Sequence, residues 1–140
     1  MMLSKKRLRT VPSVLAVDDD RDNLHLLSYI LEALNLKCYG IGDSRKVLDL
    51  AVDKTPKLIL LDIVMPNMSG FEIIKQLKSN LFTKNIPVIA ITGLASLSDR
   101  AKIKSAGFED YIGKPFAIEE LEDKLDKYLS LNLCLQETAA

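Results

Sequence analysis

The sequence predicts an α/β fold: a five-stranded parallel sheet with helices on both faces, arranged in three layers. Two observations lead to this prediction. Five short runs rich in β-branched residues alternate along the chain with segments whose apolar residues recur every three or four positions. The third and fourth of these runs are apolar throughout, which is typical of parallel strands covered on both faces.

The predicted strands are short and apolar. In chain order they are Val14 to Val17, Lys37 to Ile41, Leu58 to Leu61, Val88 to Ile91 and Asp110 to Ile112. A helix is predicted after each of them. The first begins after Asp20 or Arg21, either of which stands where a cap belongs. Its apolar positions, spaced by three and four, are Leu24, Leu27, Leu31 and Leu34.

The later helices are delimited by proline, glycine and helical spacing. The second covers about Ser44 to Asp53 and stops before Pro56, and the third runs from Phe71 to Leu77. The fourth covers Leu97 to Ala106 and ends at Gly107, a residue that readily adopts the left-handed conformation of a helix end. Apolar residues at helical spacing mark the last one: Ile118, Leu121, Leu125 and Tyr128.

Length and charge narrow the class of protein. The 140 residues suit one domain, and 19 Lys and Arg balance 19 Asp and Glu. A chain without net charge has no overall field to attract nucleic acid or an anionic membrane, so we expect neither as a partner. There is no apolar run of the roughly 18 residues that a membrane span needs, and no signal-peptide core, so we expect a cytoplasmic protein. Cys38 and Cys134 match no metal or redox spacing and are expected to be small apolar residues.

The expected domain covers residues 13–131, between a basic arm at residues 1–12 and a short tail at residues 132–140. The tail is too short for an output domain, so we expect the output to be binding. Lys5, Lys6, Arg7 and Arg9 in the arm are either a solvated charge run or a contact for an acidic patch on a partner. The sequence leaves both interpretations open.

Polar residues follow four of the predicted strands. Asp18, Asp19 and Asp20 follow the first, Asp62 the third, Thr92 the fourth and Lys114 the fifth. Because ligands of such sheets bind at the carboxyl ends of the strands, we expect these side chains to converge. Three carboxylates would repel a nucleotide phosphate, whereas Mg²⁺ prefers carboxylate oxygens. Asp19 or Asp20 could instead cap the first helix.

With these residues the chain resembles a response-regulator receiver domain, the CheY-like phosphoacceptor module of two-component signalling. The resemblance covers about Ser13 to Leu131 and implies the flavodoxin-like fold of a stand-alone receiver. It rests on four motifs in order: Val17-Asp18-Asp19-Asp20, then Leu61-Asp62-Ile63-Val64-Met65-Pro66-Asn67-Met68-Ser69-Gly70, then Ala90-Ile91-Thr92, then Asp110-Tyr111-Ile112-Gly113-Lys114-Pro115-Phe116.

What the resemblance implies is a phosphoacceptor that promotes only its own phosphoryl transfer and dephosphorylation, and not an enzyme acting on other substrates. Asp62 would accept the phosphoryl group from a histidine kinase. Mg²⁺ would be bound directly by Asp19, Asp62 and the backbone carbonyl of Val64, and by Asp18 through water or at the edge of the site. Lys114 would pair with a phosphoryl oxygen, and the Lys114–Pro115 peptide bond would be cis.

The resemblance also implies a switch. The hydroxyl of Thr92 would turn toward the phosphoryl group, and Tyr111 would turn into the space that it leaves, although Tyr111 could also be a simple edge residue with a hydrated hydroxyl. The surface made by the last two helices and the last strand would then bind a downstream protein or a histidine phosphotransfer protein. Formation of a homodimer is also possible. Candidate contacts on it are Leu97, Lys102, Ile118 and Glu122.

Some positions depart from the pattern of the family. Val64 and Leu94 stand where side chains flank the mouth of the site and control water access. Both are apolar, so we expect a comparatively long-lived phosphoryl group. Ser69 replaces the usual Asp or Asn before Gly70, which we expect to change only the chemistry of the turn. The alternative functions are a pseudo-receiver, which keeps the fold without the chemistry, and a haloacid-dehalogenase-like phosphatase, which would need an aspartate in place of Val64.

Overall fold

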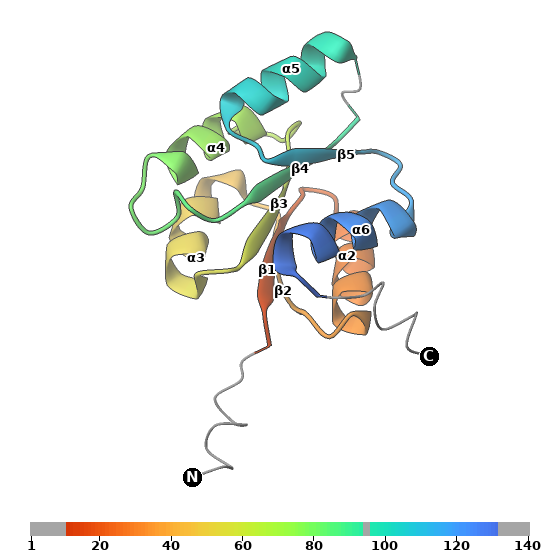
Figure 1. Cartoon of the computed structure of the whole chain (residues 1–140). Coiled ribbons are helices and arrows are strands. Elements are labelled where there is room, and N and C mark those ends of the chain that lie inside the picture. The colour runs from red at the N-terminus through yellow and green to blue at the C-terminus, as the bar shows by residue number, and fades with distance from the viewer. Residues whose placement is uncertain (1–10, 94–95, 132–140) are drawn as a thin grey trace.

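The computed structural model describes residues 11–93 and 96–131 of the chain. These residues form a five-stranded sheet of order β2-β1-β3-β4-β5 in which every neighbouring pair is parallel (Figure 1). The strands are Ser13–Val17 (β1), Lys37–Ile41 (β2), Leu58–Asp62 (β3), Val88–Thr92 (β4) and Asp110–Gly113 (β5). The predicted fold is confirmed, and each predicted strand agrees with the observed one to within about one residue at either end.

Helices connect the strands as the sequence predicts. They are α2 (Arg21–Ala33), α3 (Val47–Lys54), α4 (Gly70–Lys78), α5 (Leu97–Ala106) and α6 (Ile118–Leu129). The second predicted helix differs at its start, where one 3₁₀ turn, η1 (Ser44–Lys46), leads into α3. Gly107 ends α5 with a φ of 111°, as predicted. No described helix combines the length and the apolar character needed to cross a membrane.

Side chains with oxygen acceptors fix where three of the helices begin. Asp20, not Arg21, caps α2, because its carboxylate accepts a hydrogen bond from the backbone N–H of Asp22. Ser69 and Ser96 form capping boxes at the starts of α4 and α5. Ser69 therefore does more than alter a turn: it sets the start of α4 just after the loop that leaves β3.

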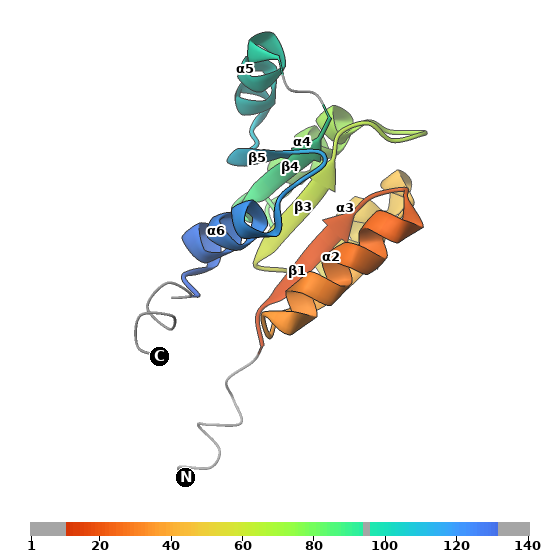
Figure 2. The same ribbon diagram turned by 90° about the vertical axis from the view of Figure 1, so that its right-hand side faces the viewer.

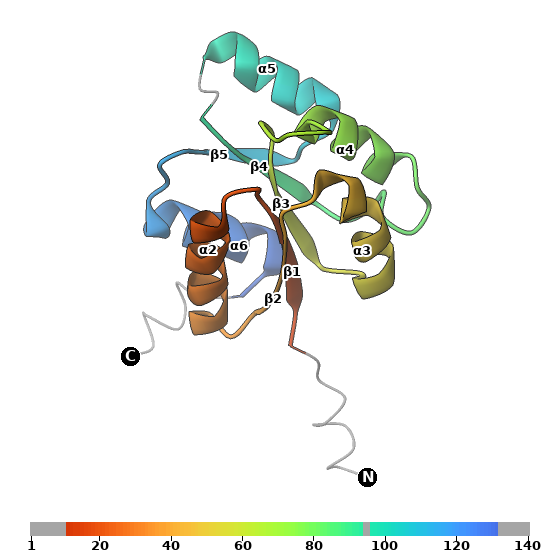
Figure 3. The ribbon, with the colours of Figure 1, turned by 180° about the vertical axis from the view of Figure 1, so that it is seen from behind.

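The sheet lies between two helical layers (Figure 1, Figure 3). Alternate strand residues point to opposite faces, so Leu15 and Ile59 pack with α3, α4 and α5, whereas Val14 and Leu58 pack with α2 and α6. Figure 2 looks onto the layer formed by α2 and α6. Every residue of β3 and β4 is buried, which explains their continuous apolar sequences.

The strand order puts the candidate residues at one edge. β1 pairs with both β2 and β3, so the chain reverses its direction of travel across the sheet between these strands. The register sets Val17 beside Leu61, and Thr92 beside Gly113. The residues that follow, or end, β1, β3, β4 and β5 are therefore neighbours in space, as the sequence analysis expects.

Candidate functional site

Asp18 is the buried anchor of the polar residues at this edge, with 2% of its surface exposed. Its Oδ1 accepts a hydrogen bond from the backbone N–H of Asp20 at 2.9 Å. Its Oδ2 accepts one from the Asn23 amide at 3.2 Å and one from the Lys114 ammonium at 2.9 Å. Burial and these contacts hold the carboxylate in one orientation, so Asp18 positions its neighbours more than it faces solvent.

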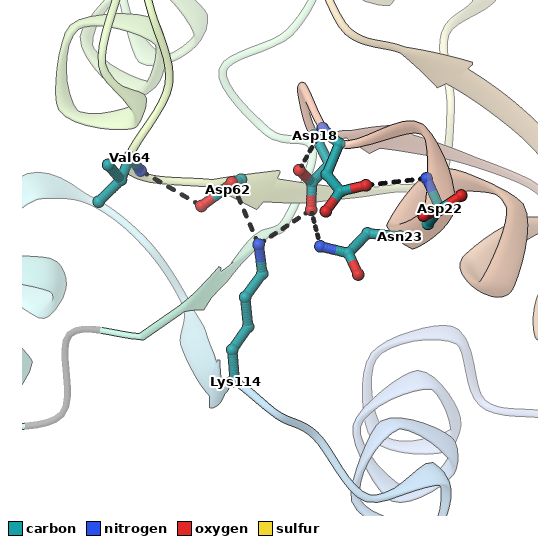
Figure 4. A network of polar contacts seen from close by, with 7 residues as sticks. Asp18, Asp22, Asn23, Asp62, Val64 and Lys114 are labelled. Atoms are coloured by element: carbon teal, nitrogen blue, oxygen red, sulfur yellow. Dashed lines mark hydrogen bonds and ion pairs between the residues drawn. The ribbon is translucent and has the colours of Figure 1, made fainter.

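Asp62 is the last residue of β3 and is 6% exposed. The backbone N–H of Val64 donates to its Oδ1, and the Lys114 ammonium donates to its Oδ2, both at 3.2 Å (Figure 4). Lys114 thus bridges two carboxylates that are 44 residues apart in the sequence. Its own backbone N–H donates to the carbonyl of Thr92 at 2.8 Å, and the Lys114–Pro115 bond is cis, as the resemblance implies.

The electrostatics of the cluster favour a further cation. Burial raises the pKa of the Asp62 carboxyl, and the charge of Asp18 adds to this, although Lys114 acts in the opposite direction. Burial alone would lower the pKa of Lys114, but its contacts with Asp18 and Asp62 outweigh burial, so that its pKa is raised. One ammonium therefore serves two buried carboxylates, and negative charge remains in excess.

A third carboxylate completes an oxygen-rich set. Ligand oxygens of Asp18, Asp19 and Asp62 all lie within 4.8 Å of one another. Asp19 is exposed, so one side of the set is open to solvent. Two or three carboxylate oxygens with room for water are the ligands that Mg²⁺ prefers, so the residues present fit this ion.

The loop that follows Asp62 is held in place by two contacts that sequence reasoning missed. The Ser44 hydroxyl, from η1, donates to the Pro66 carbonyl at 2.9 Å and accepts from the Met68 N–H at 3.1 Å. At Gly70, an added Cβ would lie 2.8 Å from the Asp62 carbonyl oxygen, too close for any side chain. Gly70 belongs to a motif quoted above, but nothing near Ser44 signals its role, because its partners are more than twenty residues away.

Of the two candidate switch residues, Thr92 lies at this edge and Tyr111 lies farther back, opposite Ala90 in the sheet. Thr92 ends β4 and is fully buried. Tyr111 in β5 is half-buried, and the guanidinium of Arg100, from α5, lies 5.2 Å from its ring centroid. Arg100 is a second residue that sequence reasoning missed. The helical pattern around Arg100 does not indicate which residue of the sheet its side chain contacts.

The remaining predicted residues lie farther out. Val64 is 65% exposed at the mouth of the site, and Leu94 lies outside the described residues, as do Cys134 and the basic residues of the arm. Leu97 and Ile118 are exposed apolar residues of α5 and α6, at 80% and 49%. Lys102 is exposed and Glu122 half-buried. Cys38 is half-buried, and burial raises the pKa of its thiol, as expected of a small apolar residue.

Comparison with known proteins is consistent with this geometry. A family model described as "Response regulator receiver domain" matches residues 14–126. The polar-differentiation response regulator DivK of Brucella anthropi is 36% identical over 117 residues, which cover 84% of this chain and 95% of that protein.

Solved structures agree. The chemotaxis protein CheY4 of Vibrio cholerae has a TM-score of 0.80 at 28% identity, covering 85% of this chain and 99% of that one. The receiver domain of the sensor histidine kinase PA1611 from Pseudomonas aeruginosa has a TM-score of 0.80 at 25% identity, covering 86% and 99%. In that structure a magnesium ion is coordinated in the active-site cleft.

Proposed function

The chain belongs to the response regulator receiver family, whose members act in two-component signalling, and on that premise we propose that Asp62 is its phosphoacceptor. The observation that best supports the proposal is the position of the Asp62 carboxylate. It ends a buried strand, lies 3.2 Å from the Lys114 ammonium, and shares an oxygen-rich cluster with Asp18 and Asp19. A nucleophile, a fixed cation and a candidate metal site therefore stand within one small volume.

The reaction is a transfer between two side chains. An oxygen of ionised Asp62 attacks the phosphorus of a phosphohistidine on a histidine kinase, in line with the bond to nitrogen. The new oxygen–phosphorus bond forms as the phosphorus–nitrogen bond breaks, and its electron pair stays on the imidazole of the kinase. Lys114 balances charge on one phosphoryl oxygen, and the carboxylate of Asp18 keeps that ammonium aimed at the site.

A divalent cation fits the donor set and would offset charge on the other phosphoryl oxygens. Asp19, Asp62 and the backbone carbonyl of Val64 would hold Mg²⁺, and Asp18 would act through a water molecule. Asp18 is suited to the indirect role, because its oxygens already accept three hydrogen bonds. Asp19 is exposed and so remains available for direct coordination.

Phosphorylation is expected to change the surface of α5, β5 and α6. The Thr92 hydroxyl turns toward the phosphoryl group, and Tyr111 moves into the space that it leaves. Tyr111 then has to give up its contact with Arg100, so α5 and β5 respond together. Exposed Leu97 and Ile118 offer apolar contacts on this surface to a downstream protein, a histidine phosphotransfer protein or a second copy of the chain.

This role makes the chain a signalling phosphoacceptor in the cytoplasm, and not an enzyme with a substrate of its own. The chemistry is limited to gaining and losing one phosphoryl group. We place the receiver domain at residues 13–131, which the sheet and its helices fill.

The experiment is intact-mass analysis after incubation with acetyl phosphate, with and without Mg²⁺. We expect the native chain to gain one phosphoryl group only with Mg²⁺, the Asp62→Asn variant to gain none, and the Asp49→Asn variant, changed at an exposed aspartate of α3, to behave like the native chain. No gain by the native chain under any condition would point to the pseudo-receiver. Gain by Asp62→Asn would move the acceptor elsewhere.

A further inference from the structure

A basic depression lies at the opposite end of the sheet from Asp62, where β1 and β2 begin. Its volume is about 640 Å³, within the range of ligand pockets. We call it the basic pocket, and its lining residues are Val11, Pro12, Ser13, Lys37, Tyr39, Lys54, Thr55 and Lys57. They come from the start of β1, from β2, and from the end of α3 with the turn into β3. None of them carries a negative charge.

Two of the three lysines of the basic pocket lie beside one aromatic ring. The ammonium groups of Lys37 and Lys54 lie 5.2 Å and 5.3 Å from the centroid of the Tyr39 ring. Attraction to the face of the ring holds both cations near the pocket although they repel each other. In the described part of the chain, Lys54 pairs at 3.5 Å with Asp53, whereas Lys37 and Lys57 form no ion pair. An incoming anion would relieve this excess of positive charge.

The lining favours carboxylates over phosphate. Phosphate sites typically use arginine forks or the N–H groups at a helix N-terminus. The basic pocket has no arginine, and the helix that reaches it, α3, ends there at Lys54 and so supplies none of the N–H groups of a helix N-terminus. Lysine ammonium groups pair with carboxylates without demanding a planar, two-pronged partner. Val11, Pro12 and the Tyr39 ring add apolar surface for a side chain between the carboxylates.

We propose that the basic pocket docks an acidic segment of a partner protein, with carboxylates on Lys37, Lys54 and Lys57 and an apolar side chain against Tyr39. Charge complementarity supports this assignment, because the lining holds three lysines and no acidic residue. The pocket lies at the other end of the strands from Asp62, so the partner leaves the phosphoacceptor site and the surface of α5, β5 and α6 accessible. The pocket thus tethers the protein to a partner in both phosphorylation states.

The test measures binding of a defined acidic probe to the full chain. The probe is a short fluorescein-labelled peptide in which glutamates flank one phenylalanine. Its binding is measured by fluorescence anisotropy at low and at physiological salt. The charge-reversal variant is Lys37→Glu with Lys57→Glu. Its matched control is Lys75→Glu with Lys84→Glu, which makes the same charge change at exposed lysines away from the pocket. A peptide with glutamine in place of glutamate, and a single-stranded oligonucleotide of equal charge, serve as competing probes.

We expect the glutamate peptide to bind the native chain and the control, with affinity falling as salt rises, and to bind the Lys37→Glu, Lys57→Glu variant at least about tenfold more weakly. Amide shifts on binding should centre on β2 and the turn after α3. Three results would each overturn the proposal: equal affinity of both variants, equal binding of the glutamine peptide, or tighter binding of the oligonucleotide. Phosphorylation by acetyl phosphate should be the same in both variants, so failure here is separate from failure of the Asp62 assignment.

Discussion

Replacing Asp62 by asparagine is expected to stabilise the metal-free protein at neutral pH, although it removes the phosphoacceptor. The asparagine would keep the size of the side chain and an oxygen acceptor for the Val64 N–H. What the substitution removes is a negative charge in a cluster that already has too many. The raised pKa of Asp62 reflects the same excess of negative charge, because burial and the charge of Asp18 together outweigh the contact with Lys114.

The distances in the cluster set the size of the effect. Carboxylate oxygens of Asp18, Asp19 and Asp62 lie within 4.8 Å of one another, where each repulsion costs about 3.5 kcal/mol at an effective dielectric constant of about 20. Asp62 takes part in one such repulsion, with buried Asp18, because Asp19 is exposed and solvent screens its charge. Its ion pair with Lys114 at 3.2 Å returns about 5 kcal/mol on the same scale. The loss of hydration on burial, the largest cause of the raised pKa, costs several kcal/mol and outweighs this surplus of attraction, so the balance is a destabilisation of about 2 kcal/mol.

Urea unfolding in EDTA measures this difference. At neutral pH we expect Asp62→Asn to have a free energy of unfolding about 2 kcal/mol above that of the native chain, and the exposed Asp49→Asn control to be unchanged. Mg²⁺ at a hundredfold excess over its Kd would add about 2.7 kcal/mol to the native chain and less to the variant, which lacks one ligand. Mg²⁺ should therefore cancel or reverse the ranking of the two proteins.

The same difference should depend on pH. Because the pKa of Asp62 is raised in the folded state, the folded protein holds this proton more tightly than the unfolded chain does. The penalty is complete above the folded-state pKa and disappears below the unfolded-state pKa of about 3.9. The advantage of Asp62→Asn should fade as the pH falls through this window. An Asp62→Asn variant less stable than the native chain in EDTA, or an advantage unchanged at acid pH, would refute the reasoning.

Three further variants test the surroundings of the site. Gly70→Ala should lower the free energy of unfolding by about 2 kcal/mol, because its Cβ would stand 2.7 Å from the neighbouring backbone, and an unchanged urea midpoint would contradict this. Val64→Asn combined with Leu94→Glu should shorten the phosphoryl lifetime at least about tenfold by positioning water, as followed by intact mass, and an unchanged lifetime would show that these residues do not limit water access. Arg100→Ala should remove a cation–π contact worth about 0.5–1 kcal/mol and shift Tyr111 inward, as seen by NMR of fluorotyrosine-labelled protein. An unshifted Tyr111 signal would mean that Arg100 does not hold the ring.

Much of the site follows from the sequence, because its residues stand at the ends of strands. Asp62 follows an unbroken run of four apolar residues, which favours a buried strand, and the carboxyl ends of parallel strands lie at one edge. Continuous apolar runs alternate along the chain with segments whose apolar residues have helical spacing. This pattern likewise predicts the order of strands and helices, since it reflects which faces are buried. That information is local, so strand limits are recovered to within about one residue.

Contacts between distant segments required the tertiary structure. The bridge from Lys114 to Asp18 and Asp62 follows from the strand order, which no local pattern encodes. The same is true of the hydrogen bonds between Ser44 and the loop after Asp62. It is also true of the contact between Arg100 and the ring of Tyr111, because both depend on how the segments pack.

The basic pocket shows the same division most clearly. Lys37, Lys54 and Lys57 are ordinary surface lysines in the sequence, and a net charge of zero gives no sign that they act together. The parallel order of β2, β1 and β3 brings them to one end of the sheet, around Tyr39. Sequence periodicity thus indicated which face of each helix or strand is buried, because the spacing of apolar residues is a property of each segment. Only the folded chain decided which charges meet, because electrostatic energy depends on distance in space and not on separation along the chain.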